Sequence, residues 1–199
     1  MKRSTNLVII SGPSGSGKDS VIEGLAKQGV PIERVVTTTT RDVRPGETPG
    51  REYYFVSEND LQKKIDNQEM AEWARVDNNR LYGVTKEELT RVQNLHDKIG
   101  IWRIDWKGVL EAKKNISDIL TILIEPPDIE QLLERARGRG DDNEQELQER
   151  LAYSKEFLKH RNLYDYSVIN KKGELEQTIK EVKNILAREG YLDSENGIR

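Results

Sequence analysis

The sequence contains no cysteine, and its 199 residues include only two histidines and two methionines. The absence of cysteine excludes disulfide bonds and any metal site built from thiolates. Long hydrophobic runs are also missing, since the first apolar segment, Leu7 to Ile10, has four residues and follows a polar, basic start. A segment this short is neither a signal peptide nor a membrane span, so we expect a cytoplasmic protein without a membrane partner.

Neither sign of charge dominates, because 35 acidic residues oppose 32 basic ones and leave a net charge of −3. This balance argues against broad nucleic-acid binding. Hydrophobic residues make up 35% of the chain and charged residues 34%, as in a polar globular protein that still has a proper core. The length suits one domain, or one core with a small inserted lobe. We expect a monomer or homodimer that binds small molecules.

A glycine-rich segment, Ser11 to Asp19, lies between a strand pattern and a helix pattern. Leu7 to Ile10 predicts a buried parallel strand, and the apolar spacing from Val21 to Ala26 predicts a helix face. The phosphate-binding pattern G-x-x-x-x-G-K requires this context, whereas an ordinary glycine turn does not. The glycines let the loop N–H groups turn inward at the positive end of the helix, and Lys18 adds a charge for the β- and γ-phosphates. The predicted ATP-binding residues in this segment are Gly12, Pro13, Ser14, Gly15, Ser16, Gly17, Lys18, Asp19 and Ser20.

The position after the lysine, where a Ser or Thr hydroxyl normally binds Mg²⁺, is Asp19. A carboxylate is also a hard oxygen ligand, so Asp19 can keep the metal. It also places a negative charge near triphosphate oxygens, which only a bound cation makes tolerable. An equally open alternative is that Asp19 stabilises the N-terminus of the helix.

Downstream, Arg34 to Val36 predicts a short second strand, and the segment from Thr37 to Gly50, rich in Pro and Gly at its end, predicts a loop. Arg41 and Arg44, close behind hydroxyl residues, suit a bidentate grip on a second phosphate. Tyr53 can add a phenol donor. Taken alone, such a segment is more often a solvated charged loop.

Residues 37–94 contain little apolar mass and predict a small lobe inserted into the main sheet. Ser57 to Asp60 predicts a capping box that opens a helix through Ile65. Met70 to Val76 and Leu81 to Val84 predict two short strands joined by a polar turn.

Asp105 follows the apolar segment Ile99 to Ile104, which predicts that the main sheet resumes there. A carboxylate at the carboxyl edge of a parallel strand, near a phosphate loop, suits a residue that orders Mg²⁺ or water. The alternative is a cap for the helix predicted from Trp106 to Lys114.

Arginines and glycines alternate from Arg135 to Gly140, after a buried strand predicted at Leu120 to Ile124 and a helix opened by Asp128. Two glycines among arginines predict a mobile cationic loop, and Arg150 lies on the following helix. Mobile arginines that close over a triphosphate neutralise the charge that develops in phosphoryl transfer. A plain polar turn is the alternative.

The chain closes with a strand predicted at Ser167 to Ile169 and an amphipathic helix from Glu174 to Arg188. Residues 189–199 are expected to form a frayed tail.

Up to about residue 188, the chain resembles the guanylate kinase family, whose motifs occur in the same order and spacing. They are Gly12 to Lys18, Thr39 to Glu47, Gly50 to Val56, Glu72 to Ala74, Tyr82-Gly83, Ile104-Asp105, Arg135 to Gly140 and Asn170. The resemblance implies an α/β P-loop NTPase fold with a three-layer α/β/α core around a parallel sheet. Its expected parts are the core (1–36 and 95–188), a nucleoside-monophosphate-binding lobe (37–94) and a short lid (about 138–148). The implied reaction transfers the γ-phosphate of ATP to GMP or dGMP, with Mg²⁺.

The family pattern also implies a role for each matched residue. Those assigned to GMP are Thr37, Arg41, Arg44, Tyr53, Glu72 and Tyr82. Among them, Glu72 would read the guanine N1–H and 2-amino group, and Thr37 would donate to O6. Those assigned to ATP phosphates or to catalysis are Lys18, Arg41, Arg135, Arg139, Arg150 and Asp105, with Asp105 near the metal.

Three positions depart from the family pattern. Val84 stands where a hydroxyl residue that helps to read guanine follows Tyr-Gly, although Thr85 is adjacent. Arg103 stands where the family has an Asp that faces the base, and Asp19 replaces the Ser of the phosphate loop. A site that loses a base-reading hydrogen bond discriminates less well, so phosphoryl transfer is the firmer expectation and guanine the weaker one.

Two other interpretations fit parts of the pattern. Ribose 1,5-bisphosphate phosphokinase also has Gly-Lys-Asp-Ser and Tyr-Gly-Val, but an acceptor without a base needs no Glu72. Non-catalytic guanylate-kinase-like binding modules have damaged phosphate loops, whereas Lys18 and the lid arginines are intact here. The convergence of donor and acceptor residues favours the enzyme.

Overall fold

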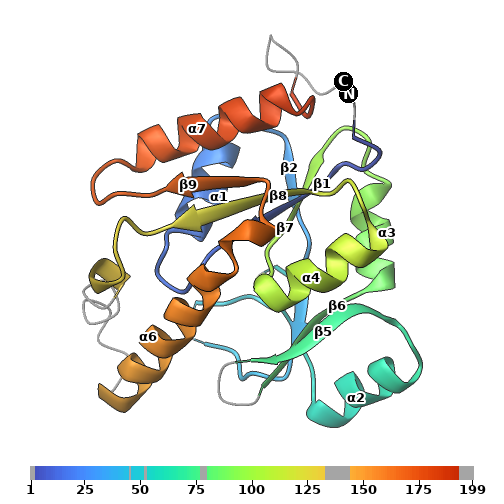
Figure 1. Cartoon of the computed structure of the whole chain (residues 1–199). Helices are drawn as coiled ribbons and strands as arrows, with labels where there is room; N and C mark the ends of the chain where they lie inside the picture. The colour runs from blue at the N-terminus through green and yellow to red at the C-terminus, as the bar shows by residue number, and fades with distance from the viewer. Residues whose placement is uncertain (1–2, 45, 52, 77–79, 133–143, 193–199) are drawn as a thin grey trace.

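The computed structural model describes residues 3–44, 46–51, 53–76, 80–132 and 144–192 (Figure 1). A central sheet contains five parallel strands in the order β2-β7-β1-β8-β9. These strands are β1 (Leu7–Ser11), β2 (Ile32–Arg34), β7 (Ile99–Trp102), β8 (Leu120–Glu125) and β9 (Tyr166–Ile169). Because β1 lies in the middle, the segment after Ser11 starts at the centre of the carboxyl edge, where open α/β sheets bind ligands.

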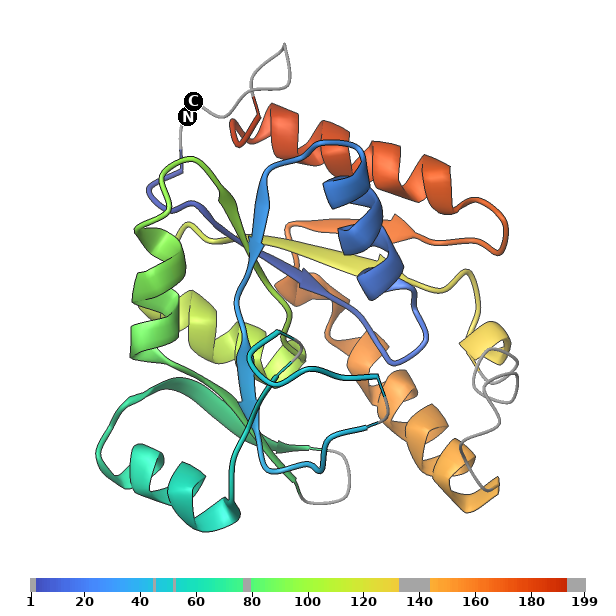
Figure 2. The ribbon, with the colours of Figure 1, turned by 180° about the vertical axis from the view of Figure 1, so that it is seen from behind.

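Helices cover both faces of this sheet (Figures 1 and 2). The described helices are α1 (Lys18–Lys27), α2 (Glu58–Asp66), α3 (Lys86–Gln93), α4 (Trp106–Asn115), α6 (Glu144–Lys159), the 3₁₀ helix η1 (Arg161–Leu163) and α7 (Leu175–Arg188). In β1, Val8 and Ile10 pack in a cluster with α1 and α7, whereas Leu7 and Ile9 pack in a second cluster with α3, α4 and α6. This alternation places a buried layer on each side of the sheet and confirms the predicted α/β/α core. None of the described helices combines the length and the apolar character needed to cross a bilayer.

A second, four-stranded sheet has the order β4-β3-β6-β5. Its strands are β3 (Thr37–Thr39), β4 (Tyr53–Phe55), β5 (Met70–Val76) and β6 (Arg80–Thr85). Its own buried cluster consists of Leu61, Met70 and Leu81, which agrees with the small apolar mass expected from the sequence. The predicted helix N-cap is confirmed, since the Ser57 hydroxyl accepts the N–H of Asp60 at 3.1 Å.

The strand expected at Arg34 to Val36 was wrong in position. Strand β2 ends at Arg34, buried Val35 and Val36 link the two sheets, and β3 occupies Thr37–Thr39, which the sequence placed in a loop. These β-branched threonines pair with β4 on one side and β6 on the other. The Pro and Gly residues that predicted a loop lie between Pro45 and Gly50, after the end of β3, and do not interrupt the strand.

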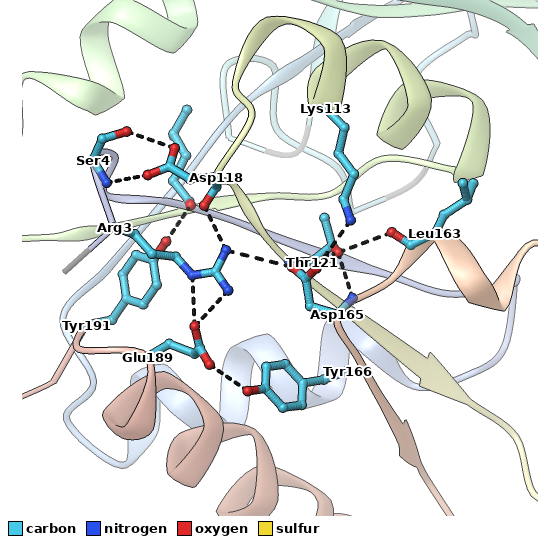
Figure 3. Close-up of polar contacts among 11 residues, drawn as sticks. Arg3, Ser4, Lys113, Asp118, Thr121, Leu163, Asp165, Tyr166, Glu189 and Tyr191 are labelled. Atoms are coloured by element: carbon cyan, nitrogen blue, oxygen red, sulfur yellow. Dashed lines mark hydrogen bonds and ion pairs between the residues drawn. The ribbon is translucent and has the colours of Figure 1, made fainter. Parts of the chain in front are cut away.

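Polar contacts fasten the opposite, amino-terminal edge of the central sheet (Figure 3). Arg3 donates to one carboxylate oxygen of Glu189 at 2.9 and 2.7 Å and to the carbonyl of Asp118 at 2.7 Å. The Tyr166 hydroxyl donates to the other oxygen of Glu189 at 2.5 Å. These bonds tie the start of the described chain to the residue after α7, which leaves the carboxyl edge of the sheet as the open side for a site.

Candidate active site

The glycine-rich loop begins where β1 ends and turns directly into α1. Gly15 and Gly17 have φ angles of 83° and 90°, a left-handed conformation that favours glycine. The N–H of Ser16 donates to the carbonyl of Pro13 at 3.1 Å and closes the turn. Ser16 is fully buried, yet its hydroxyl has no hydrogen-bond partner within the described parts of the chain. This hydroxyl and the helix N-terminus at Gly17, which no side chain caps, together suit a bound anion.

Asn170, which follows β9, holds this loop from a neighbouring position at the sheet edge. Its Nδ2 donates to the carbonyl of Ser16 at 2.8 Å, and its Oδ1 accepts from the hydroxyl of Thr178 at 3.2 Å. A Cβ on Gly17 would lie 2.1 Å from the same Nδ2, so a glycine is required for this approach. The sequence motifs included Asn170 without a role, and the structure makes it a positioning residue of the phosphate loop.

Replacing Asn170 with alanine should raise the KM for ATP several-fold, because the loop loses the bond that holds the Ser16 carbonyl. The buried carbonyl then lacks a donor, so the free energy of unfolding should fall by about 1–3 kcal/mol. Steady-state kinetics and denaturant unfolding measure the two effects. Asn115→Ala, which removes an exposed amide from α4, is the matched control. An unchanged KM together with unchanged stability would contradict the positioning role.

Asp19, in the first turn of α1, forms an ion pair with Arg103 through Oδ1 and Nη1. Burial alone would raise the pKa of Asp19, but the charges of Arg103 and Lys18 outweigh it and hold that pKa below its usual range. The Nζ of Lys18 lies 3.4 Å from the carbonyl of Pro13 and therefore stays over the loop. Asp19 is thus ionised and already has a cationic partner.

The second sheet brings three of the predicted acceptor residues onto neighbouring strands. Thr37 of β3 lies in register with Tyr53 of β4, and Thr39 lies in register with Tyr82 of β6. The rings of Tyr53 and Tyr82 meet edge to face, with 6.1 Å between their centroids. Thr37, Tyr53 and Tyr82 therefore share one small surface beside the central sheet.

Arg41 is buried, and Glu47 orients it. Its guanidinium carbon lies 5.2 Å from the ring centroid of Tyr53 and 5.5 Å from that of Phe55. Its Nη2 pairs with one oxygen of Glu47 at 2.6 Å, and the other oxygen accepts the backbone N–H of Arg44 at 2.8 Å. The side chain of Arg44 remains exposed. Glu47 belongs to the motif Thr39 to Glu47, but its role in orienting Arg41 was not predicted. The local signal for it is an acidic residue three positions after Arg44.

Glu72 lies in β5, is 7% exposed, and receives no hydrogen bond from a described residue. Burial, followed by the negative charges of Asp105 and Glu111, raises the pKa of Glu72 from 4.5 to about 8. A Cβ on Gly108 would lie 3.2 Å from Glu72 Oε2, so this glycine of α4 leaves room at the carboxyl group. A buried carboxyl group without a protein donor suits a ligand that supplies N–H groups.

Sequence and structure comparisons decide the family. A family model described as guanylate kinase matches residues 4–189. The chain belongs to the guanylate kinase family. The guanylate kinase of Rickettsia prowazekii is 35% identical over 183 residues, which cover 92% of this chain and 91% of that protein. For the guanylate kinase of Haemophilus influenzae, the identity is 34% over 187 residues, with 92% and 88% covered. The crystal structure of guanylate kinase from Anaplasma phagocytophilum matches with a TM-score of 0.71 at 26% identity, covering 94% of this chain and 88% of that one.

Two of the three departures from the guanylate kinase pattern, Asp19 and Arg103, lie against each other as the ion pair described above. At the third, Val84 is fully buried in the core cluster that contains β1 and α4. The neighbouring hydroxyl of Thr85 accepts the N–H of Glu88 at 3.1 Å and caps α3. Thr85 therefore serves the N-terminus of α3.

Asp105 is the N-cap of α4, as the alternative interpretation of the sequence proposed. Its Oδ1 accepts the N–H of Gly108 at 3.0 Å, and its Oδ2 accepts the hydroxyl of Tyr153 at 2.5 Å. The negative charge of Asp105 also contributes to the raised pKa of Glu72. Within the described residues, no group of three or more His, Asp or Glu side chains is arranged to hold a metal ion.

The remaining predicted site residues divide into two groups. Gly12 and Pro13 are buried in the phosphate loop, Ser14 is exposed on it, and Ser20 is exposed in α1. Arg135 and Arg139, with most of the expected lid, lie outside the described residues, as does the side chain of Arg150 on α6.

Proposed function

We propose that this chain transfers the γ-phosphate of ATP to GMP or dGMP and releases ADP with GDP or dGDP. The observation that carries the proposal is the buried carboxyl group of Glu72, which has no donor from the described protein and lies in the sheet that also contains Thr37, Tyr53 and Tyr82. Guanine offers two adjacent donors, N1–H and the 2-amino group, to such a group. An acceptor without a base would leave this carboxyl group buried and unmatched.

The donor and acceptor phosphates would be held by different parts of the fold. The loop N–H groups and Lys18 would bind ATP, as in other phosphate loops. Arg41, Arg44, Tyr53 and Tyr82 would bind the acceptor phosphate, with Glu47 orienting Arg41. The reaction proposed is in-line transfer by positioning and charge neutralisation, without a covalent intermediate. In the proposal, Arg135, Arg139 and Arg150 complete the charge neutralisation, and closure of the lobe and the lid excludes water.

Mg²⁺ belongs to the proposal as the metal that accompanies ATP, where it would neutralise phosphate charge. Asp19 and Asp105 are its ligands predicted from the sequence. One oxygen of Asp19 is paired with Arg103, and both oxygens of Asp105 accept hydrogen bonds. These carboxylates therefore do not form a prepared Mg²⁺ site, and we assign the metal to ATP phosphates and water, ligands that Mg²⁺ commonly keeps.

A panel of acceptors tests the proposal directly. Coupled ADP release should be fastest with GMP and dGMP, slower with IMP, which lacks the 2-amino group, and slowest with AMP and ribose 1,5-bisphosphate. Preference for ribose 1,5-bisphosphate would favour the sugar-phosphate kinase interpretation. Binding of nucleotides without ADP release from any acceptor would favour the non-catalytic binding module.

A further inference from the structure

Arg103 connects the donor loop with the acceptor sheet. It follows β7, and its Nη1 pairs with Asp19 Oδ1 in the first turn of α1. Its guanidinium carbon also lies 5.3 Å from the ring centroid of Tyr53, the ring that Arg41 approaches at 5.2 Å. One side chain therefore contacts a residue of the phosphate loop and a residue of the second sheet.

The surroundings of Asp19 are rich in positive charge. One small pocket beside the pair is lined by three arginines, Arg34, Arg51 and Arg103, together with apolar side chains. Arg34 forms its ion pair with Glu23, at 3.7 Å. Among the ion pairs of the described residues, Asp19 is paired with Arg103. The Arg103 side chain is 22% exposed and that of Asp19 is 50% exposed, so water screens this pair only in part.

A bare carboxylate at position 19 would oppose nucleotide phosphates, because it lies at the helix N-terminus on which they would bind. Like charges a few ångströms apart repel, and the repulsion grows as water is excluded. A bound metal ion is one way to remove it. The ion pair with Arg103 is another, and it is present before any ligand arrives.

We propose that Arg103 is a positioning residue of the donor site, which neutralises Asp19 so that nucleotide phosphates bind beside this carboxylate without a metal ion. The inference rests on the proposed function, since it takes the glycine-rich loop as the site of a nucleotide donor. Arg103 thereby separates nucleotide binding from metal binding, and Mg²⁺ is left to act on the phosphates themselves. Its contact with Tyr53 places the same side chain against the acceptor sheet.

A double-mutant cycle on ADP affinity tests this inference. Calorimetric titrations of ADP, in EDTA and in excess Mg²⁺, compare the wild type with Arg103→Ala, Asp19→Ser and the double variant. In EDTA, Arg103→Ala should weaken ADP binding about tenfold or more, because Asp19 is left unpaired beside the phosphates. In the Asp19→Ser background, Arg103→Ala should weaken ADP binding by about threefold at most, because the two residues act as a pair. In Mg²⁺, the loss should be smaller.

Arg34→Ala is the matched control, since it removes an arginine that lines the same pocket but lies against Glu23. It should change metal-free ADP affinity by less than about threefold. If Arg103→Ala lowers the melting temperature enough to compromise folding, Arg103→Gln and Arg103→Lys repeat the cycle, and only the lysine should retain metal-free binding.

An Arg103→Ala variant with wild-type metal-free affinity would overturn the inference. So would an equal loss in both Asp19 backgrounds, because it would mean that Arg103 acts on the phosphates rather than through Asp19. Failure of the wild type to bind ADP even in Mg²⁺ would count against the proposed function itself, which keeps the two failures distinct.

Discussion

Lys18→Ala should lower kcat for GMP phosphorylation by about 10²–10³-fold while leaving the fold intact, as expected when one group that stabilises charge in a transition state is removed. Lys18 lies at the start of α1 with its Nζ over the phosphate loop, 3.4 Å from the carbonyl of Pro13. The amine provides a point charge that stabilises the transferring phosphoryl group. The packing of the protein does not require this charge. Circular dichroism and thermal unfolding should therefore remain close to those of the wild type.

Lys27→Ala provides the control within the same helix, because Lys27 is exposed in the last turn of α1. Its kcat and KM should match those of the wild type. Near-normal turnover by Lys18→Ala would remove Lys18 from the mechanism. A large loss in both variants would point to damage of α1 rather than to chemistry.

Glu72→Gln should reduce the preference for GMP over AMP by about tenfold or more, because the site loses the carboxylate that would accept two guanine donors. The KM for ATP should change little, since Glu72 lies in the acceptor sheet. The specificity ratio of kcat/KM across GMP, IMP and AMP is the measurement. An unchanged ratio would show that another residue reads the base. Glu87→Gln, an exposed carboxylate on α3, serves as the control.

The raised pKa of Glu72 adds a pH signature to this prediction. In the free protein the group titrates at about 8, so it is mostly protonated at neutral pH. Guanine needs the ionised form, and GMP binding should therefore release close to one proton at pH 7. GMP affinity should rise about tenfold per unit as the pH increases toward 8 and then level off. Titrations in buffers of different ionisation enthalpy measure the proton release, which Glu72→Gln should abolish.

The raised pKa of Glu72 also predicts that the free energy of unfolding falls with increasing pH, whereas GMP affinity rises. Because the folded pKa of about 8 lies above the reference 4.5, stability is full below pH 4.5 and is lost as the pH rises toward 8. The loss has an upper slope of about 1.4 kcal/mol per pH unit. Glu72→Gln should therefore match the wild type near pH 4 and be clearly more stable at pH 8.5 without ligand. Equal melting temperatures at pH 8.5 would contradict the assigned burial and pKa.

Local patterns were sufficient for the parts of this fold that local forces decide. The phosphate loop could be predicted because its glycines lie between a short apolar strand and an amphipathic helix. Gly15 and Gly17 indeed have the left-handed conformation that favours glycine. The β5–β6 pair and the Ser57 cap follow from alternation and from side-chain bonds to nearby backbone groups.

Contacts between residues that are distant in the sequence could not be predicted in this way. Asp19 and Arg103 are 84 residues apart and meet only because β1 and β7 are neighbours in the sheet. Thr37–Thr39 became a strand because two partner strands were available to pair with it. For Asp105, the cap on the N–H of Gly108 is a local contact, but the second oxygen is occupied by the hydroxyl of Tyr153, which only the packing of α6 brings to it.

The proposed reaction requires a donor site on the glycine loop and an acceptor site on the second sheet that face each other closely enough to exchange a phosphoryl group. One ligand tests it most directly: guanosine and adenosine joined through five phosphates, a single molecule that spans both sites. Calorimetry should show one molecule bound per chain, tighter than either ADP or GMP alone, and displaced by both ATP and GMP. Displacement by only one of the two nucleotides, or an affinity no better than that of ADP, would contradict the account.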